Sequence, residues 1–149
     1  MSIPYAPPGV RIRRATEGDE STIRALVRRE HLDPTTLKWP NFLVAEDDAG
    51  QVVGIGQVKP LPGARELGSL VVVPAWRKRG VGGALIRALV AQESGDLYLV
   101  CRDTLAPYYR KFGFREIGWR DMPWPLRVKA GFGLIGRLFG IRGAFMKRV

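Results

Sequence analysis

The sequence is poor in the side chains that build disulfide frameworks and metal centres. Among its 149 residues it holds one cysteine, Cys101, and one histidine, His31. A single thiol cannot form an internal disulfide, and these two residues alone do not make a cluster with metal-ligand spacing. We therefore expect a protein with no disulfide scaffold and no metal site.

Long apolar runs and an N-terminal targeting segment are also missing. No stretch approaches the roughly 20 consecutive apolar residues of a membrane-spanning helix. The opening residues, MSIPYAPPGV, lack the basic region and apolar core of a secretory signal. We expect a cytoplasmic protein. The length and a hydrophobic content of 46% fit one globular domain that can bury a core.

Acidic residues are scarce at the C-terminal end. The sequence has 24 Lys and Arg against 14 Asp and Glu, a formal net charge of +10. Residues 127–149 contain six cations and no acid, which leaves +4 for residues 1–126. Contact with nucleic acid or an anionic membrane therefore concerns this end of the chain. The six cations are Arg127, Lys129, Arg137, Arg142, Lys147 and Arg148.

The role of residues 121–149 stays open among three interpretations. Phe132, Ile135, Leu138 and Phe139 fall near helical spacing, which favours a terminal helix that packs on the domain or on a partner. The alternatives are a basic surface helix on an anionic membrane and a nonspecific phosphate contact with nucleic acid. Interspersed glycines each cost about 1 kcal/mol of helix stability, so we expect a marginal helix that forms on docking.

The remaining pattern predicts strands alternating with helices. A strand that follows a helix is expected to pair in parallel with the strand before that helix, here residues 96–101 with residues 65–74. The order predicts an α/β fold with one mixed sheet and helices on both faces. Predicted strands cover 10–15, 41–45, 51–60, 65–74, 96–101 and 113–119, with a turn at 46–50; predicted helices cover 16–30, 80–94 and 104–112, and 60–64 is a loop.

Residues 71–89, VVVPAWRKRGVGGALIRAL, carry the strongest local signal. A β-branched run ends at Pro74, three cations and a cluster of glycines follow, and a helical segment begins. The first turn of a helix has unpaired N–H groups and a partial positive charge, so it attracts anions. Glycine lets the backbone approach such a ligand closely. The stretch predicts a pyrophosphate-binding turn; a basic turn that only redirects the chain is the alternative.

The spacing Arg77-x-x-Gly80-x-Gly82 resembles the acetyl-coenzyme A signature of the GCN5-related N-acetyltransferases. A second block, APYYRKFGF at 106–114, is similar to the C-terminal pattern of the same family. The order of elements over residues 10–119 fits as well. The usual mononucleotide and dinucleotide loops require other spacings, which are absent here.

The resemblance implies the acyl-coenzyme A N-acyltransferase fold, a mixed and mostly antiparallel sheet with helices on both faces. It implies an N-acetyltransferase domain over residues 1–120, followed by a basic, apolar extension over 121–149. The enzyme would transfer the acetyl group of acetyl-coenzyme A directly to a primary amine, of a small molecule or a peptide, in a ternary complex. A noncatalytic acyl-coenzyme A-binding module, or a protein acting on nucleic acid or membrane through its tail, is the alternative. Monomer and homodimer are both open.

The resemblance assigns the acid–base chemistry to two residues. Tyr109 takes the position that protonates the departing thiolate, and a phenol of pKa near 10 is protonated at pH 7. Glu66 takes the position where some members carry a general base. The alternatives are a core aromatic side chain at Tyr109, with Tyr108 as the fallback acid, and at Glu66 a strand-edge carboxylate paired with Arg65 or another cation.

The resemblance assigns the coenzyme to two neighbouring segments. Main-chain groups of Leu70, Val71 and Val72 would bind the pantetheine arm and polarise the acetyl carbonyl. Arg102 stands where many relatives carry an asparagine that touches the coenzyme, so it either binds coenzyme or substrate or marks a lost contact. The pyrophosphate-binding turn comprises Arg77, Lys78, Arg79, Gly80, Val81, Gly82 and Gly83.

Other polar residues have weaker assignments. Cys101 is expected to be a buried strand thiol, because direct transfer needs no acyl-enzyme. His31, Asp33 and Trp39 fall in the early loop that borders the acceptor pocket in this family. A surface histidine and a tryptophan that covers the core are the alternatives there.

Overall fold

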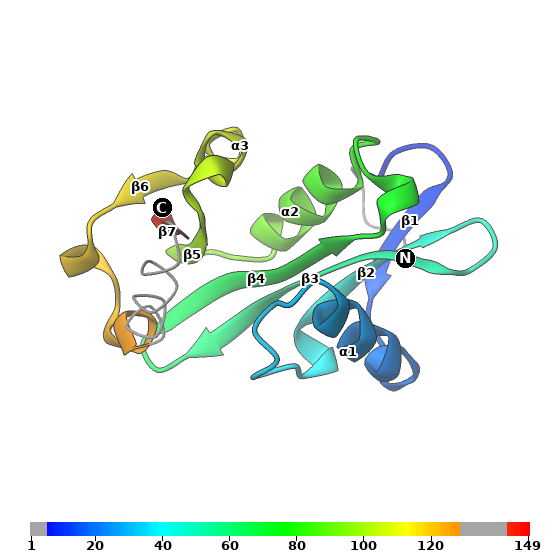
Figure 1. Cartoon of the computed structure of the whole chain (residues 1–149), viewed down its shortest axis with the longest axis horizontal. Helices are drawn as coiled ribbons and strands as arrows, with labels where there is room; N and C mark the ends of the chain where they lie inside the picture. The colour runs from blue at the N-terminus through cyan, green and yellow to red at the C-terminus, as the bar shows by residue number, and fades with distance from the viewer. Residues whose placement is uncertain (1–5, 129–142) are drawn as a thin grey trace. The chain divides into compact units, whose positions relative to one another are not determined.

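The computed structural model describes residues 6–128 and 143–149. Seven strands form a sheet in the order β1-β2-β3-β4-β5-β7-β6. The expected mixed, mostly antiparallel sheet is confirmed, since β4 and β5 pair in parallel and β1–β2, β2–β3, β5–β7 and β6–β7 pair antiparallel. The strands are β1 (Val10–Arg14), β2 (Phe42–Asp47), β3 (Val52–Leu61), β4 (Ala64–Val72), β5 (Leu97–Arg102), β6 (Arg115–Ile117) and β7 (Gly143–Arg148); the helices are α1 (Glu20–Arg29), α2 (Val81–Ala91) and α3 (Ala106–Arg110) (Figure 1).

The chain divides into two compact units. The first comprises the residues up to Lys59 together with Leu67–Gln92, and the second comprises Pro60–Glu66 and the residues from Glu93 onward. The first unit therefore holds α1, α2 and most of β1–β4. The second holds β5, β6, β7 and α3.

In the first unit α1 and α2 cover opposite faces of the strands (Figure 1). The α1 side is an apolar cluster that includes Ile55 of β3 and Val71 of β4. Side chains alternate along a strand, so Gly54 and Gly56 face the other helix. That face is flat enough for α2 to pack closely on β3. The cluster on the α1 side comprises Ala15, Ile23, Leu26, Val27, Leu37, Phe42, Val44, Ile55 and Val71.

The contact between α2 and β3 leaves no room for a side chain at either glycine. A Cβ at Gly54 would lie 3.0 Å from Leu85 Cδ1 and 3.1 Å from Val81 Cγ1. Val81 is the first residue of α2, and its β-branched side chain has little rotamer freedom in a helix. The glycines of β3 thus fix how the start of α2 sits on the sheet.

An ion-pair network joins β1 and β2 to the turn before α1. Arg13 donates to both carboxylate oxygens of Asp19, at 2.8 and 3.1 Å, and to Glu46 at 2.9 Å. The Arg13 hydrogen bonds lower the pKa of the largely buried Asp19. A lowered carboxyl pKa contributes stability above its ordinary pKa, and this contribution is lost as the pH falls through the lowered value.

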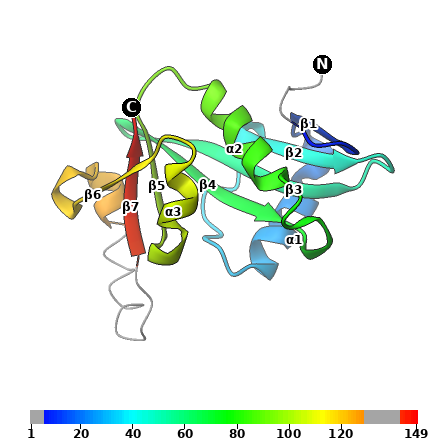
Figure 2. The ribbon, with the colours of Figure 1, turned by 90° about the horizontal axis from the view of Figure 1, so that it is seen from above.

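The second unit contains a strand that the sequence pattern did not predict. Strand β7 lies between β5 and β6, with Leu99 of β5 opposite Met146 (Figure 2). Ala144 and Met146 are buried, so alternate residues of this strand belong to the core. Residues 143–148 of the expected basic extension thus form a strand of the sheet.

The cations near the C-terminus that the structure describes are engaged within this unit. Lys147 Nζ lies 3.2 Å from Asp96 Oδ2, and the Arg148 guanidinium donates to the Phe112 carbonyl at 3.0 Å. Arg127 donates to the carbonyls of Met122 and Arg120. These cations serve local structure. The predicted helix near residues 132–139 lies outside the described residues.

Two predicted boundaries differ from the structure. The loop expected at 60–64 is a tight hairpin, because β3 continues to Leu61 and β4 begins at Ala64, with Gly63 at φ +71°. The strand expected at 113–119 is confined to Arg115–Ile117. Within residues 6–128 and 143–149 no helix has the length and apolar character needed to cross a membrane.

We predict that Gly54→Ala lowers the free energy of unfolding by about 1–3 kcal/mol, because an added methyl group overpacks the α2–β3 contact. Urea denaturation followed by circular dichroism measures this change. Gly95→Ala is the matched control, since nothing lies within 4 Å of its Cβ position. Equal stabilities for the two variants would show that α2 does not depend on this close contact.

Candidate active site

The turn before α2 has the left-handed backbone that opens it to a ligand. Lys78 has φ +63° and Gly80, the N-cap residue, has φ +85°. No side chain caps the helix, and Ala84 N–H makes a backbone bond to the Gly80 carbonyl at 3.1 Å. The amides of residues 81–83 precede that bond, so they lack intrahelical acceptors.

The cations of this turn do not all face the same way. Arg77 donates through Nε to the Val72 carbonyl at 3.0 Å and through Nη2 to Glu30 at 2.9 Å. Its guanidinium therefore fastens the turn to the end of β4 and to the end of α1. The Arg79 guanidinium lies over the Trp76 ring, 4.9 Å from its centroid.

The end of β4 lies next to this turn in the sequence and in the fold. Val71 is buried, and Leu70 and Val72 are partly buried. The Val72 carbonyl already accepts a hydrogen bond from Arg77. The Val73 N–H donates to the Val53 carbonyl at 2.9 Å. Ser69, immediately before Leu70, has φ +52°, so β4 is distorted here. The first unit thus brings Leu70–Val72 and residues 77–83 together.

The features of the turn fit a pyrophosphate. It presents amides and cations, which are hydrogen-bond donors, and nothing lies within 4 Å of the Cβ position of Gly80. Across the two described stretches of the chain, no group of three or more His, Cys, Asp or Glu side chains could hold a metal ion.

In the second unit Tyr109 is a mostly buried phenol on α3. Its ring meets Tyr108 edge-on at 5.4 Å and Phe114 at 6.1 Å between centroids. Burial raises the pKa of Tyr109 above the usual value, with smaller contributions from Cys101 and Tyr108. Burial disfavours the phenolate, so the side chain stays a neutral hydrogen-bond donor at physiological pH.

Glu66 and Arg102 also belong to the second unit. Glu66 is only 4% exposed and lies opposite Tyr98 of β5. The guanidinium of the neighbouring Arg65 donates to Glu93. Arg102 is exposed and ends β5, where the chain enters a short 3-10 turn. Tyr109, Glu66 and Arg102 thus share one unit.

Cys101 is the half-buried strand thiol expected from the sequence. Its Sγ lies 4.0 Å from the sulfur of Met146 on β7. Burial, with smaller effects of Glu116 and Asp103, raises its pKa to about 11. Such a thiol is a poor nucleophile at neutral pH, because the reactive form is the thiolate.

His31, Asp33 and Trp39 have structural roles around α1. His31 follows the C-cap of α1 and has a left-handed backbone, with φ +54°. Its N–H donates to the Arg28 carbonyl, and the Leu32 N–H donates to the Val27 carbonyl. Asp33 accepts bonds from Thr35. Trp39 packs on the apolar cluster beside α1, so the core-covering interpretation describes it.

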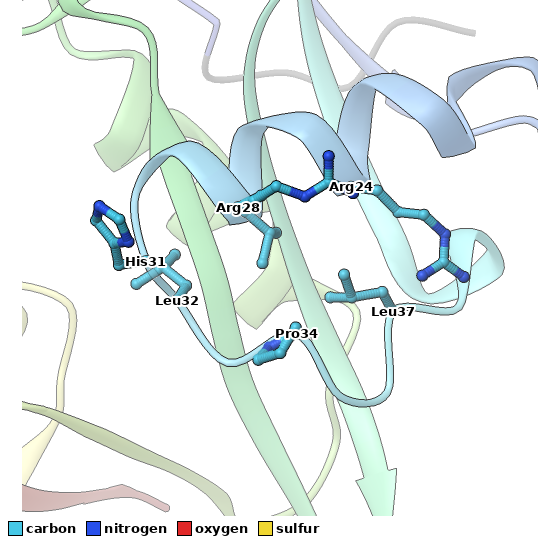
Figure 3. A pocket seen from close by; sticks show the side chains of 7 residues that line it. Arg24, Arg28, His31, Leu32, Pro34 and Leu37 are labelled. Atoms are coloured by element: carbon cyan, nitrogen blue, oxygen red, sulfur yellow. The ribbon is translucent and has the colours of Figure 1, made fainter.

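A pocket of about 360 Å³ lies between α1 and the loop that follows it. Figure 3 shows its side chains around the curve of that loop. The polar members, Arg24, Arg28 and His31, are exposed. The pocket is lined by Arg24, Val27, Arg28, His31, Leu32, Pro34 and Leu37.

Sequence reasoning missed one residue of the first unit, Gln57 on β3. It is 0% exposed, and its Nε2 donates to Ser69 Oγ at 2.9 Å and to the Thr36 carbonyl at 3.3 Å. Its Oε1 is buried and has no partner within the described residues. The sequence does offer one indication: Gln57 is a polar residue within an apolar strand, and it follows Ile55 by two positions, so both side chains point to the same face of β3.

Comparison with known proteins decides the family. Residues 38–116, more than half of the chain, match the family described as "Acetyltransferase (GNAT) domain". The chain belongs to this family. A comparison with curated proteins found no match.

Solved structures of GNAT proteins share the fold at low identity. N-acetylglutamate synthase from Neisseria gonorrhoeae, complexed with coenzyme A and N-acetyl-glutamate, superposes with a TM-score of 0.75 at 22% identity, over 93% of this chain and 34% of that chain. A Mycobacterium tuberculosis protein in complex with coenzyme A and NLQ superposes with a TM-score of 0.73 at 20% identity, over 93% of this chain and 98% of that chain. An acetyltransferase of the GNAT family from Staphylococcus aureus superposes with a TM-score of 0.65 at 16% identity, over 93% of this chain and 98% of that chain.

The chain spans about a third of the length of the N-acetylglutamate synthase that it matches. The GNAT family and fold expected from the sequence are confirmed, and acetyl-coenzyme A is the co-substrate of this family. The acceptor of this chain and the roles of its individual site residues stay predictions.

We predict that Cys101 reacts with iodoacetamide at pH 8 about 100-fold more slowly than an exposed cysteine, because raising the pKa from 9.0 to about 11 reduces the thiolate fraction by this factor. Mass spectrometry follows the rate, and the same protein unfolded in urea is the control. A native rate equal to the unfolded rate would contradict the burial of this thiol.

Proposed function

We propose that this chain is an N-acetyltransferase that transfers the acetyl group of acetyl-coenzyme A directly to a primary amine. The observation that carries the proposal is the uncapped start of α2, with Gly80 at φ +85° and free first-turn amides, in a chain of the GNAT family. Domain residues 1–120 contain this machinery. The role of the extension over 121–149 stays a prediction.

Residues 77–83 are proposed to bind the pyrophosphate of the co-substrate. The amides of Val81, Gly82 and Gly83 donate to its oxygens, and Lys78 and Arg79 supply positive charge. Arg77 mainly positions the turn, because its guanidinium donates to the Val72 carbonyl and to Glu30. Main-chain groups of Leu70–Val72 orient the thioester arm.

The chemical step requires a neutral amine and a proton for the leaving thiolate. An alkylamine has a pKa near 10.4, so deprotonation at pH 7 costs about 4–5 kcal/mol without help. Glu66 is proposed to accept this proton, directly or through water. Tyr109 gives its phenolic proton to the thiolate, and the raised pKa keeps that proton in place until the C–S bond breaks.

The acceptor is proposed to be a small-molecule or peptide amine. Two structures of one relative, the N-acetylglutamate synthase from Neisseria gonorrhoeae, support a small acceptor: one contains N-acetyl-glutamate and the other contains L-arginine. Arg102 is exposed at the end of β5 and is proposed to bind the coenzyme or an anionic part of the acceptor.

We predict that Tyr109→Phe lowers kcat about 10²–10⁴-fold while leaving the Kd for acetyl-coenzyme A unchanged, because the variant removes only the proton donor. A thiol-release assay and calorimetry measure the two quantities. Tyr108→Phe is the matched control on the same helix and should keep nearly full turnover. Retention of kcat in Tyr109→Phe would remove the phenol from the mechanism.

The raised pKa of Tyr109 also predicts how kcat depends on pH. Burial favours the neutral phenol, so ionisation of Tyr109 should not reduce kcat below pH 10. A pH–rate profile of the wild type tests this. An alkaline fall in kcat that Tyr109→Phe abolishes, centred below pH 10, would show that the phenol is not protected by burial.

A further inference from the structure

The side-chain carbonyl oxygen of Gln57 is buried, and none of the described residues donates a hydrogen bond to it. The side-chain amide is oriented by the Thr36 carbonyl, which can only accept and therefore faces the NH₂ group at 3.3 Å. Ser69 Oγ lies 2.9 Å from the same nitrogen. Oε1 is consequently left as a buried acceptor without a donor. Buried polar atoms are paired in the great majority of cases, so this exception calls for a cause.

The groups around Gln57 are held in uncommon backbone conformations. Thr36 has φ +57° and Ser69 has φ +52°, and neither residue is glycine. Left-handed backbone is disfavoured at residues that carry a Cβ atom. Two strained residues that contact one buried amide indicate a functional site more than an ordinary core position.

Residues 33–36 pass beside Gln57 and contact polar side chains of β3. Residues 34–36 are exposed, and the Thr36 bond to Gln57 is long at 3.3 Å. On the same face of β3, the buried Lys59 Nζ lies 3.6 Å from Asp33 Oδ2. Thr36 and Asp33 thus each contact a buried polar side chain of β3.

Gln57 also lies beside the part of β4 that is assigned to the thioester. Its partner Ser69 directly precedes Leu70, the first residue of the segment proposed to orient the acetyl group. A donor bound at Oε1 would therefore lie beside the strand segment that is proposed to orient the thioester arm. Amines carry such N–H donors, whereas a carboxylate or phosphate offers none.

We infer that Gln57 binds the acceptor: once residues 33–36 move aside, Oε1 accepts a hydrogen bond from an N–H of the incoming primary amine. This inference rests on the proposed function. In the absence of acceptor, the NH₂ group of Gln57 donates to the Thr36 carbonyl and so contacts residues 33–36. Gln57 is thus a residue that sets the acceptor KM.

Two substitutions at Gln57 separate acceptor binding from a structural role. Gln57→Leu removes both the donor and the acceptor, whereas Gln57→Glu loses donation to Thr36 but keeps an acceptor oxygen. The substrate is the amine that the wild type acetylates fastest among L-glutamate, L-arginine, spermidine and a lysine tetrapeptide. Ser69→Ala is the control that removes only the hydroxyl partner of the amide nitrogen.

We expect Gln57→Leu to raise the acceptor KM about tenfold or more, as loss of a hydrogen bond to an ionisable group predicts. Gln57→Glu and Ser69→Ala should stay within about threefold of the wild type, and KM for acetyl-coenzyme A should not change in any variant. An unchanged KM in Gln57→Leu, or an equal increase in Gln57→Leu and Gln57→Glu, overturns the inference. Wild-type protein that acetylates none of the four amines contradicts the proposed function instead.

A measurement on the wild type covers the case in which a variant fails to fold. The side-chain NH₂ resonances of ¹⁵N-labelled protein report on the Gln57 amide directly. Addition of millimolar amine should shift the Gln57 pair, because binding changes the partners of both ends of the amide. No shift of that pair under any of the four amines also overturns the inference, whether or not acetyl transfer is observed.

Discussion

The first turn of α2, left without a side-chain cap, is the feature on which the rest of the first unit depends. Gly80 takes a left-handed conformation that lets the chain turn sharply into the helix, and the amides that follow have no acceptor in the helix itself. Bare amides at a helix start favour a bound anion. The fold supports this turn from two sides: Arg77 ties it to β4 and α1, and Val81 packs on Gly54.

Burial decides the chemistry of the second unit. The same desolvation that raises the pKa of Tyr109 raises that of Cys101, and the two consequences differ. A phenol that keeps its proton stays available as a hydrogen-bond donor to a departing thiolate. A thiol that keeps its proton becomes inert. One apolar environment therefore supports direct transfer and disfavours a covalent acyl-enzyme on Cys101.

The sequence predicted the parts of the fold that local pattern dictates. Glycine spacing after Pro74 located the start of α2, and the proline-containing block at 106–114 located α3 and Tyr109. Strand β7 escaped prediction because its apolar residues are few and its pairing with β5 is set by partners about 45 positions away, such as Leu99 and Met146. Periodicity in a short segment cannot reveal such long-range pairing.

Individual side-chain partners were harder to predict than elements. The guanidinium of Arg77 was expected on the coenzyme, yet it binds Glu30, 47 residues earlier in the chain. Gln57 gave no motif at all, since its significance lies in the contacts of one buried amide with a loop and a neighbouring strand. Such contacts depend on tertiary packing, which a residue pattern does not encode.

The central claim is that the amides at the start of α2 bind the pyrophosphate of coenzyme A. Titration of ¹⁵N-labelled protein with coenzyme A, followed through its backbone amide resonances, tests this most directly. The account predicts that the amides of Val81, Gly82 and Gly83 show large downfield shifts that saturate, and that acetylpantetheine, which lacks the pyrophosphate, does not reproduce them. Saturable binding of coenzyme A that leaves these three amides unmoved would contradict it.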